Sequence, residues 1–212
     1  MTDVDERPLR ARFVALDDTV SPPEGVVVYE AKDPGRAVDI AIARGEVAPY
    51  GAVLWDSACD LARRLYRASL HGRHVLELGC GCGLVGIVAA RAGAQVLCTD
   101  VDVLTLVAVE RGAKDAGVTV DVLHFDIIGA QPLPAVRGAP ATDVILSDVL
   151  YEGALAAAAA RRALEALGAG ARVFVGDPDR AGRRDFIRLL GDKGYEAVFD
   201  GSVCVLMPKG RR

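Results

Sequence analysis

The sequence lacks the cysteine pattern of a disulfide-stabilised or zinc-binding protein. Its five cysteines are an odd number, and the one Cys-x-Cys pair, Cys80 and Cys82, has neither the spacing nor the histidine partners of a zinc site. We therefore expect no bound metal. Unpaired cysteines are typical of a reducing compartment, so we expect a cytoplasmic protein.

Long apolar runs and an excess of positive charge are also missing. No 18-residue stretch is free of charges or of glycine and proline turns, and the N-terminus (MTDVDERPLR) has no apolar region typical of a signal peptide. With 25 Lys and Arg against 29 Asp and Glu, the net charge is −4. We therefore expect no membrane as partner. We also expect no nucleic acid, because proteins that bind nucleic-acid phosphates usually carry an excess of Lys and Arg. No pattern indicates an oligomeric state.

What the sequence does contain is the composition of an ordinary globular domain, with 51% hydrophobic and 25% charged residues in 212. Residues 1–48 form an expected N-terminal extension, which is polar at first and is interrupted by prolines at 22 and 23. Within it we predict a short strand over 26–30 and a helix over 35–44. Residues 49–212 form the expected main domain.

Strands and helices alternate along the main domain after a first amphipathic helix over 57–68. This pattern predicts an α/β fold, in which a parallel sheet is covered by helices on both faces. A hairpin around Gly201 and Ser202 adds one antiparallel strand. The predicted strands span 74–78, 95–100, 120–126, 143–148, 172–177, 195–200 and 203–207. The predicted helices between them span 84–92, 103–116, 153–167 and 183–193.

A glycine-rich loop, ELGCGCGLVG from Glu77 to Gly86, joins the first long strand to its helix. Gly81, Gly83 and Gly86 fit a dinucleotide fingerprint, with Asp100 at the right distance to hold a ribose. The other candidate ligand is S-adenosylmethionine (SAM), which carries an ammonium and a sulfonium and no phosphate. Glu77 would repel a pyrophosphate but attract a cation, so the sequence favours SAM over NAD.

Carboxylates end four successive predicted strands, at Glu77, Asp100, Asp126 and Asp148. Each could simply cap a helix, but together they line the crevice where open α/β sheets bind ligands. We expect Asp100 to bind the ribose hydroxyls and Asp126 the adenine amine. The residues expected to bind the cofactor from this pattern are Glu77, Gly79, Cys80, Gly81, Gly83, Asp100, Val101, Asp126, Ile127 and Ser147.

From about residue 49 to the C-terminus, this arrangement resembles the class I SAM-dependent methyltransferases. The resemblance implies a Rossmann-like seven-strand sheet of order 3-2-1-4-5-7-6. Strand 7 is then antiparallel, and residues 203–207 supply it.

Three segments are similar to one branch, the family-16 lysine methyltransferases. The first is Pro49-Tyr50-Gly-Ala-Val-Leu-Trp55-Asp56-Ser-Ala, and the resemblance implies that Trp55 borders the SAM pocket. The second is Ser147-Asp148-Val-Leu-Tyr151, which matches an Asp-x-x-Tyr/Phe motif. The third, Gly176 to Arg180, is similar to a Gly-Asp-Pro-Gly-Arg segment of the members that methylate the electron transfer flavoprotein beta subunit, but carries Asp179 in place of the second glycine.

This resemblance implies a SAM-dependent methyltransferase with a nitrogen acceptor. We take Asp148 and Tyr151 as the candidate catalytic residues. Asp148 would position the incoming ammonium, and Tyr151 would make a cation–π contact or, alternatively, serve only as a structural tyrosine beside a helix. The prolines of the DNA-base methyltransferase motif are absent after Asp148, which argues against base methylation.

A protein lysine is the favoured acceptor, with the electron transfer flavoprotein beta subunit as first candidate. The alternatives are a small-molecule N-methyltransferase for a nicotinamide-like amine, and a catalytically silent SAM-binding interaction module. Four arginines outside these motifs are expected on solvated helix faces: Arg161, Arg162, Arg183 and Arg184.

Overall fold

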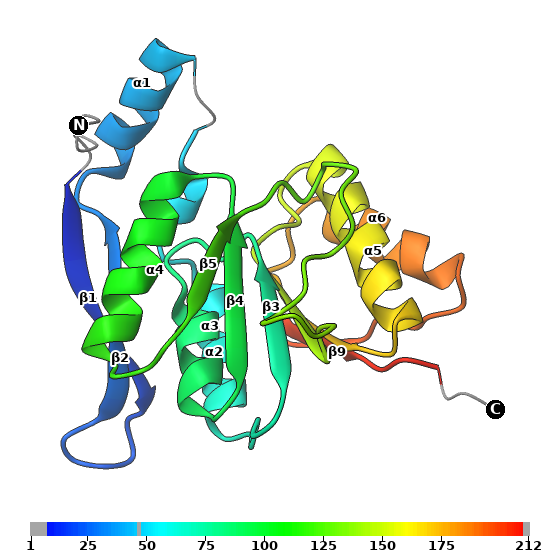
Figure 1. Cartoon of the computed structure of the whole chain (residues 1–212). Coiled ribbons are helices and arrows are strands. Elements are labelled where there is room, and N and C mark those ends of the chain that lie inside the picture. Colours follow the sequence, from blue (N-terminus) through cyan, green and yellow to red (C-terminus); the bar gives the residue numbers. More distant parts are fainter. Residues whose placement is uncertain (1–7, 46–47, 210–212) are drawn as a thin grey trace.

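A twisted seven-stranded sheet forms the centre of the computed structural model, which describes residues 8–45 and 48–209 (Figure 1). Residues 1–7 lie outside the described residues. They are part of the N-terminal segment from which we predicted that the sequence has no signal peptide. β9 is antiparallel to both of its neighbours, and the other neighbouring pairs are parallel. The strands in spatial order are β5 (Asp121–His124), β4 (Gln95–Asp100), β3 (His74–Leu78), β6 (Asp143–Ser147), β7 (Arg172–Gly176), β9 (Val203–Leu206) and β8 (Phe199–Asp200). This is the order 3-2-1-4-5-7-6, so the predicted topology is confirmed.

Helices cover both faces of the sheet, as predicted (Figure 1). Successive strand residues alternate between two cores, because side chains along a strand point to opposite faces. Val75 lies in the core beneath α2, α3 and α4, whereas Leu76 and Leu78 lie in the core beneath α5 and α6. The helices are α1 (Pro34–Arg44), α2 (Asp56–Tyr66), α3 (Leu84–Arg91), α4 (Val103–Asp115), α5 (Gly153–Gly168) and α6 (Arg183–Gly191), with a 3-10 turn η1 (Tyr50–Ala52).

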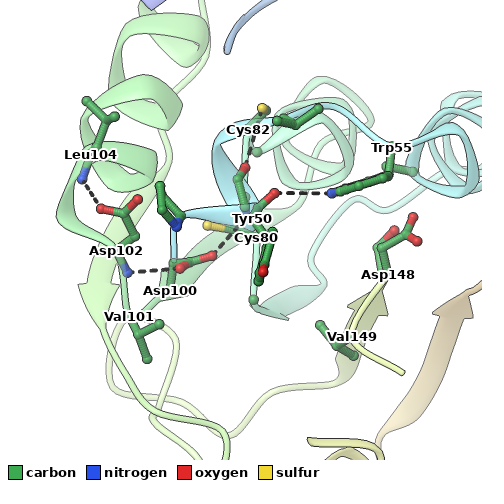
Figure 2. A pocket seen from close by; sticks show the side chains of 18 of the residues that line it. Tyr50, Trp55, Cys80, Cys82, Asp100, Val101, Asp102, Leu104, Asp148 and Val149 are labelled. Atoms are coloured by element: carbon green, nitrogen blue, oxygen red, sulfur yellow. Dashed lines mark hydrogen bonds between the residues drawn. The ribbon is translucent and has the colours of Figure 1, made fainter. Parts of the chain in front are cut away.

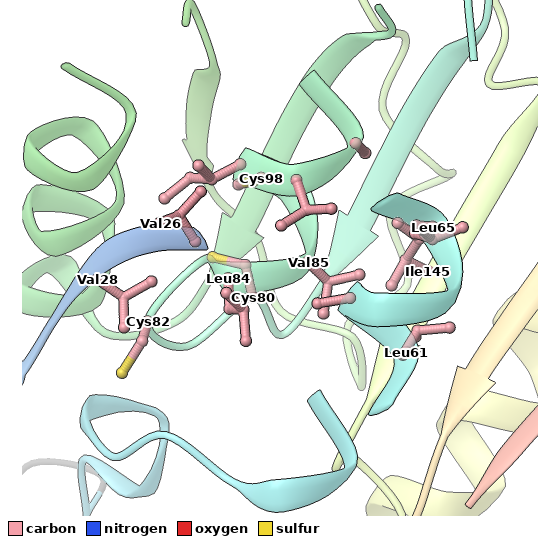
Figure 3. Close-up of a cluster of buried hydrophobic side chains, with 14 of the residues drawn as sticks. Val26, Val28, Leu61, Leu65, Cys80, Cys82, Leu84, Val85, Cys98 and Ile145 are labelled. Atoms are coloured by element: carbon pink, nitrogen blue, oxygen red, sulfur yellow. The ribbon is translucent and has the colours of Figure 1, made fainter. Parts of the chain in front are cut away.

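The predicted strand over 26–30 pairs with a partner that the sequence pattern did not reveal. β1 (Leu9–Asp17) and β2 (Glu24–Ala31) form an antiparallel hairpin that packs on α2 and α4. Val26 and Val28 face the same core as Leu84 and Val85 of α3 (Figure 3). The hairpin therefore contributes to the main core, while a domain division at residue 48 stays a prediction.

Glu30 of this hairpin fastens the chain that leads into α2. Its carboxylate is 2% exposed, pairs with Arg10 at 2.8 Å and accepts a hydrogen bond from the Leu54 amide at 3.2 Å. A buried carboxylate needs such partners to offset its desolvation. The N-terminal hairpin thereby helps to position η1 and Trp55.

The C-terminal hairpin is shorter than predicted. β8 begins at Phe199, because a turn follows α6, closed by a hydrogen bond of 3.0 Å from the Tyr195 amide to the Leu190 carbonyl, and residues 195–198 are in neither a helix nor a strand. Across the described ranges, we find no helix with both the length and the apolar character to span a membrane.

Candidate active site

A cavity of about 1580 Å³ opens at the carboxyl ends of β3, β4 and β6. Parallel strands place their carboxyl ends at one edge of the sheet, which is where such folds bind ligands. The structure brings every residue predicted for the site to the wall of this one cavity. They are Trp55, Glu77, Gly79, Cys80, Gly81, Gly83, Asp100, Val101, Asp126, Ile127, Ser147, Asp148 and Tyr151.

The glycine loop adopts a backbone path that side chains would obstruct. Gly79 and Gly81 have φ values of 67° and 50°, in the left-handed region that favours glycine. A Cβ at Gly81 would lie 2.7 Å from the Gly51 carbonyl oxygen, and one at Gly79 would lie 2.8 Å from a methyl group of Val149. Glycine at these two positions therefore lets η1 and the start of the Asp-x-x-Tyr segment close against the loop.

The two loop cysteines are structural in this arrangement. Cys80 and Cys82 are 8% and 3% exposed, and Cys82 Sγ lies 3.6 Å from the Gly51 carbonyl oxygen. Burial raises the pKa of both thiols. A thiol with a raised pKa is a poor nucleophile, so these residues act through packing and through their backbone.

Glu77 faces the interior of the fold as well as the cavity. Its Oε2 accepts hydrogen bonds from the Gly86 amide at 2.9 Å and from Cys98 Sγ at 3.3 Å. The residue is 1% exposed, and burial raises its pKa to about 7. Glu77 thus holds the first turn of α3 against the sheet, and a nearby cation would favour its ionised form.

Asp100 and Asp126 occupy different surroundings. Asp100 is 7% exposed and accepts from the Gly81 amide and the Asp102 amide, each at 3.0 Å. Burial raises its pKa. Asp126 is exposed and accepts from the Ile128 amide at 2.8 Å. Asp100 therefore connects the glycine loop to the turn before α4, whereas Asp126 shapes the loop after β5.

Asp148 lies just beyond β6 with a left-handed backbone, at a φ of 55°. Its carboxylate is buried, accepts a hydrogen bond from the Ser57 hydroxyl, and pairs with the Arg180 guanidinium at 3.3 Å. Burial raises the pKa of Asp148, and these two partners oppose that rise. Neither Ser57 nor Arg180 was assigned a role from the sequence, although each lies within a motif segment, beside Trp55 and at the end of Gly176–Arg180.

Three aromatic side chains line the cavity, Tyr50 and Trp55, which Figure 2 labels, and Tyr151. Tyr50 and Tyr151 are in edge-to-face contact, with ring centroids 6.0 Å apart and an interplanar angle of 70°. Trp55 Nε1 donates to the Tyr50 carbonyl at 3.2 Å, and the Arg180 guanidinium carbon lies 4.7 Å from the centre of the Trp55 ring. All three aromatic residues are between 37% and 47% exposed, which makes them accessible to a ligand.

The prediction that four arginines are solvated is wrong for two of them. Arg162 is 1% exposed: it donates to the carbonyls of Ile127, Gly129 and Gln131 at 2.6–3.1 Å and lies over the Phe125 ring. An arginine can be buried in this way because each of its three guanidinium nitrogens donates to a partner. Arg162 thus holds the loop that carries Ile127 into the cavity.

Arg183 is the second exception. It is 12% exposed and donates to the fully buried carboxylate of Asp177 at 2.8 Å. The same Asp177 oxygen accepts from the amides of Asp179 and Arg180, at 2.9 and 3.0 Å. Asp179 has a φ of 72°, so this turn places a residue in the left-handed region, where glycine, the residue that the resemblance implies here, is favoured.

The cavity suits SAM. Ser147 lines the cavity, and its buried Oγ has no hydrogen-bond partner among the described residues, which leaves it with unused hydrogen-bonding capacity. The carboxylates of Asp100 and Asp148 favour a ligand with positive charge. In the described part of the chain, no cluster of three or more side chains is arranged to hold a metal ion.

The sheet order and the position of the cavity define the fold class of the class I SAM-dependent methyltransferases. A solved Thermus thermophilus 16S rRNA N2 G1207 methyltransferase, in complex with AdoMet and guanosine, is similar in fold, with a TM-score of 0.62 and 17% identity. The similarity covers 96% of this chain and 51% of that one.

The sequence profile of the lysine methyltransferase family matches residues 36–173, and the chain belongs to this family. It is 31% identical over 144 residues to the electron transfer flavoprotein beta subunit lysine methyltransferase of Danio rerio, covering 63% of this chain and 51% of the relative. It is 44% identical over 75 residues to the protein N-lysine methyltransferase METTL21A of Xenopus tropicalis, covering 34% of each. The chain thus spans between a third and a half of the length of these relatives. The prediction of SAM as cofactor is confirmed at the level of the family.

Proposed function

We propose that the protein is a SAM-dependent N-methyltransferase that modifies a lysine of a protein, within a reducing cytoplasm. The observation that carries the proposal is that Asp148 and Tyr151 line the same cavity as the glycine loop. The names of the relatives point to protein lysines, and that of one points to the electron transfer flavoprotein beta subunit. We take this subunit as the first candidate substrate and a ribosomal protein as the second.

The inner wall would bind the cofactor. In this proposal Asp100 binds the ribose hydroxyls, Asp126 accepts from the adenine amine, and the free hydroxyl of Ser147 bonds the amino-acid end. Asp100 already holds the Gly81 amide at 3.0 Å, so a ligand that bonds its carboxylate also meets the loop backbone. The surrounding Val101 and Ile127 supply apolar contact.

The outer wall would bind the acceptor. SAM supplies a methyl group on a sulfonium, and the attacking nitrogen needs a free lone pair. A lysine has an unperturbed pKa near 10.4, so the site must desolvate the amine and orient it. Asp148 would hold the arriving ammonium, and Tyr50, Trp55 and Tyr151 would exclude water around it. Turnover should then rise with pH through the alkaline range, as the acceptor loses its proton.

The test is incubation of the protein with tritiated SAM and a cell extract, followed by electrophoresis. A labelled protein band, absent with the D148N variant, is the expected result. Mass spectrometry of the band should show lysine shifts of about 14, 28 or 42 Da for one to three methyl groups.

Other outcomes would point to the alternatives. Label in a small amine such as nicotinamide, with no labelled protein, would indicate a small-molecule methyltransferase. SAM binding without any labelled product would indicate a silent binding module.

A further inference from the structure

Arg180 lies between two groups that bind cations. Its guanidinium carbon is 4.7 Å from the centre of the Trp55 ring, and its Nη2 is 3.3 Å from Asp148 Oδ1. Trp55 and Asp148 come from different elements, the segment before α2 and the end of β6, and both line the cavity (Figure 2). The Tyr50–Tyr151 pair borders the same region.

An aromatic face beside a carboxylate is the environment in which an alkylammonium ion binds well. The ring attracts the cation through its quadrupole, and the carboxylate adds a charge-assisted hydrogen bond. Asp148 is oriented for this by the Ser57 hydroxyl, which bonds its other oxygen. The protein's own arginine therefore occupies a place that suits the side chain of a lysine.

Arg180 is held weakly in this place. It makes one long ion pair with Asp148, its Nε is buried without a hydrogen-bond partner, and its side chain is 32% exposed. Arg183, three residues further on, is 12% exposed and pairs with Asp177 at 2.8 Å. A donor left unpaired costs free energy, so moving the Arg180 side chain into solvent would relieve part of that cost.

We propose that Trp55 and Asp148 form the subsite for the alkylammonium group of the acceptor, and that Arg180 fills this subsite until the acceptor displaces it. This inference rests on the proposed lysine methyltransferase function and names its acceptor subsite. Arg180 then acts as a specificity residue, because a neutral side chain has no charge with which to replace the guanidinium. An ammonium group on a side chain long enough to enter the subsite displaces the Arg180 guanidinium.

Trp55 is the only tryptophan of the chain, so its fluorescence reports directly on this subsite. We would titrate the protein, without SAM, with Nα-acetyl-lysine methylamide and with its neutral isostere Nα-acetyl-norleucine methylamide. The variants are R180A, R180Q and D148N, and R184A removes an exposed arginine from α6, the helix that follows Arg180, as a matched control. Thermal melting confirms that each variant is folded.

Removal of Arg180 should tighten binding of the lysine compound about fivefold, because the ammonium then no longer has to displace the guanidinium from Asp148 and from the Trp55 ring. R180Q should behave like R180A, R184A should match the unmodified protein, and D148N should weaken binding. The norleucine compound should bind poorly to all of them.

The proposal is overturned if R180A and R180Q bind the lysine compound no more tightly than the unmodified protein. It is also overturned if the norleucine compound binds equally well, or if R180A shows no saturable fluorescence change. Because the titration involves no methyl transfer, its outcome is separate from the labelling experiment. Binding by the subsite with no methylated protein would contradict only the proposed function.

Discussion

The Gly81 amide donates a hydrogen bond of 3.0 Å to Asp100 Oδ2, which joins the glycine loop after β3 to the end of β4. The second oxygen of Asp100 holds the Asp102 amide, also at 3.0 Å, at the start of α4. One carboxylate thus links two walls of the cavity. A ligand bonded to it is placed against both.

Asp100→Ala should weaken SAM binding by about 1–3 kcal/mol, because a buried charge-assisted hydrogen bond to the ligand and the support of Gly81 are lost together. Isothermal titration calorimetry with SAM measures the change. Asp102 stays in place as the cap of α4 in this variant, so the helix should still form. Unchanged affinity would remove Asp100 from the cofactor site.

Asp148→Asn should reduce turnover much more than SAM affinity, since we propose that Asp148 binds the acceptor, and its partners are Ser57 and Arg180. Calorimetry and an activity assay on the same preparation separate the two effects. If Asp148→Asn and Asp100→Ala lose SAM affinity equally, the division between cofactor and acceptor residues is wrong.

Glu77 should make the protein less stable as pH rises. Its folded pKa, about 7, lies above the ordinary value of 4.5, so its contribution is complete below 4.5 and is lost as the pH rises through 7. Glu77→Gln keeps an acceptor for the Gly86 amide and does not ionise. The stability of Glu77→Gln relative to the unmodified protein should therefore increase by about 2–3 kcal/mol between pH 5 and 8. Urea unfolding at several pH values measures this, and parallel curves would contradict it.

Arg162→Met should destabilise the fold by about 3 kcal/mol, because three carbonyls and Glu165 lose a buried partner. It should also weaken SAM binding, since the loop with Ile127 is no longer held. Arg184→Met, at an exposed position, should change stability by less than about 0.5 kcal/mol. Equal effects of the two substitutions, in thermal and chemical unfolding, would show that Arg162 is not a support of this loop.

Local patterns predicted the alternation of strands and helices and the strand-end residues of the cavity, whereas the strand order and the places of Trp55 and Tyr151 followed from the family resemblance. The alternation of Leu76 and Leu78 with Val75 follows from strand geometry, and the glycine loop and strand-end carboxylates lie where one strand after another ends. Parallel strands bring those ends to one edge without any further information. Residues as far apart as Glu77 and Asp148 could therefore be placed at one cavity from the sequence.

Tertiary structure decided the contacts between segments that no local pattern connects. The sequence spacing does not show that β1 pairs with β2, or that Arg162 is buried under the loop after β5 while its neighbour Arg161 stays exposed. Ser57 meets Asp148 across 91 positions, and Arg180 reaches the same carboxylate from beyond β7. Such contacts depend on how the packed helices bring distant side chains together. Periodicity in the sequence reports only which face of its own element a residue occupies.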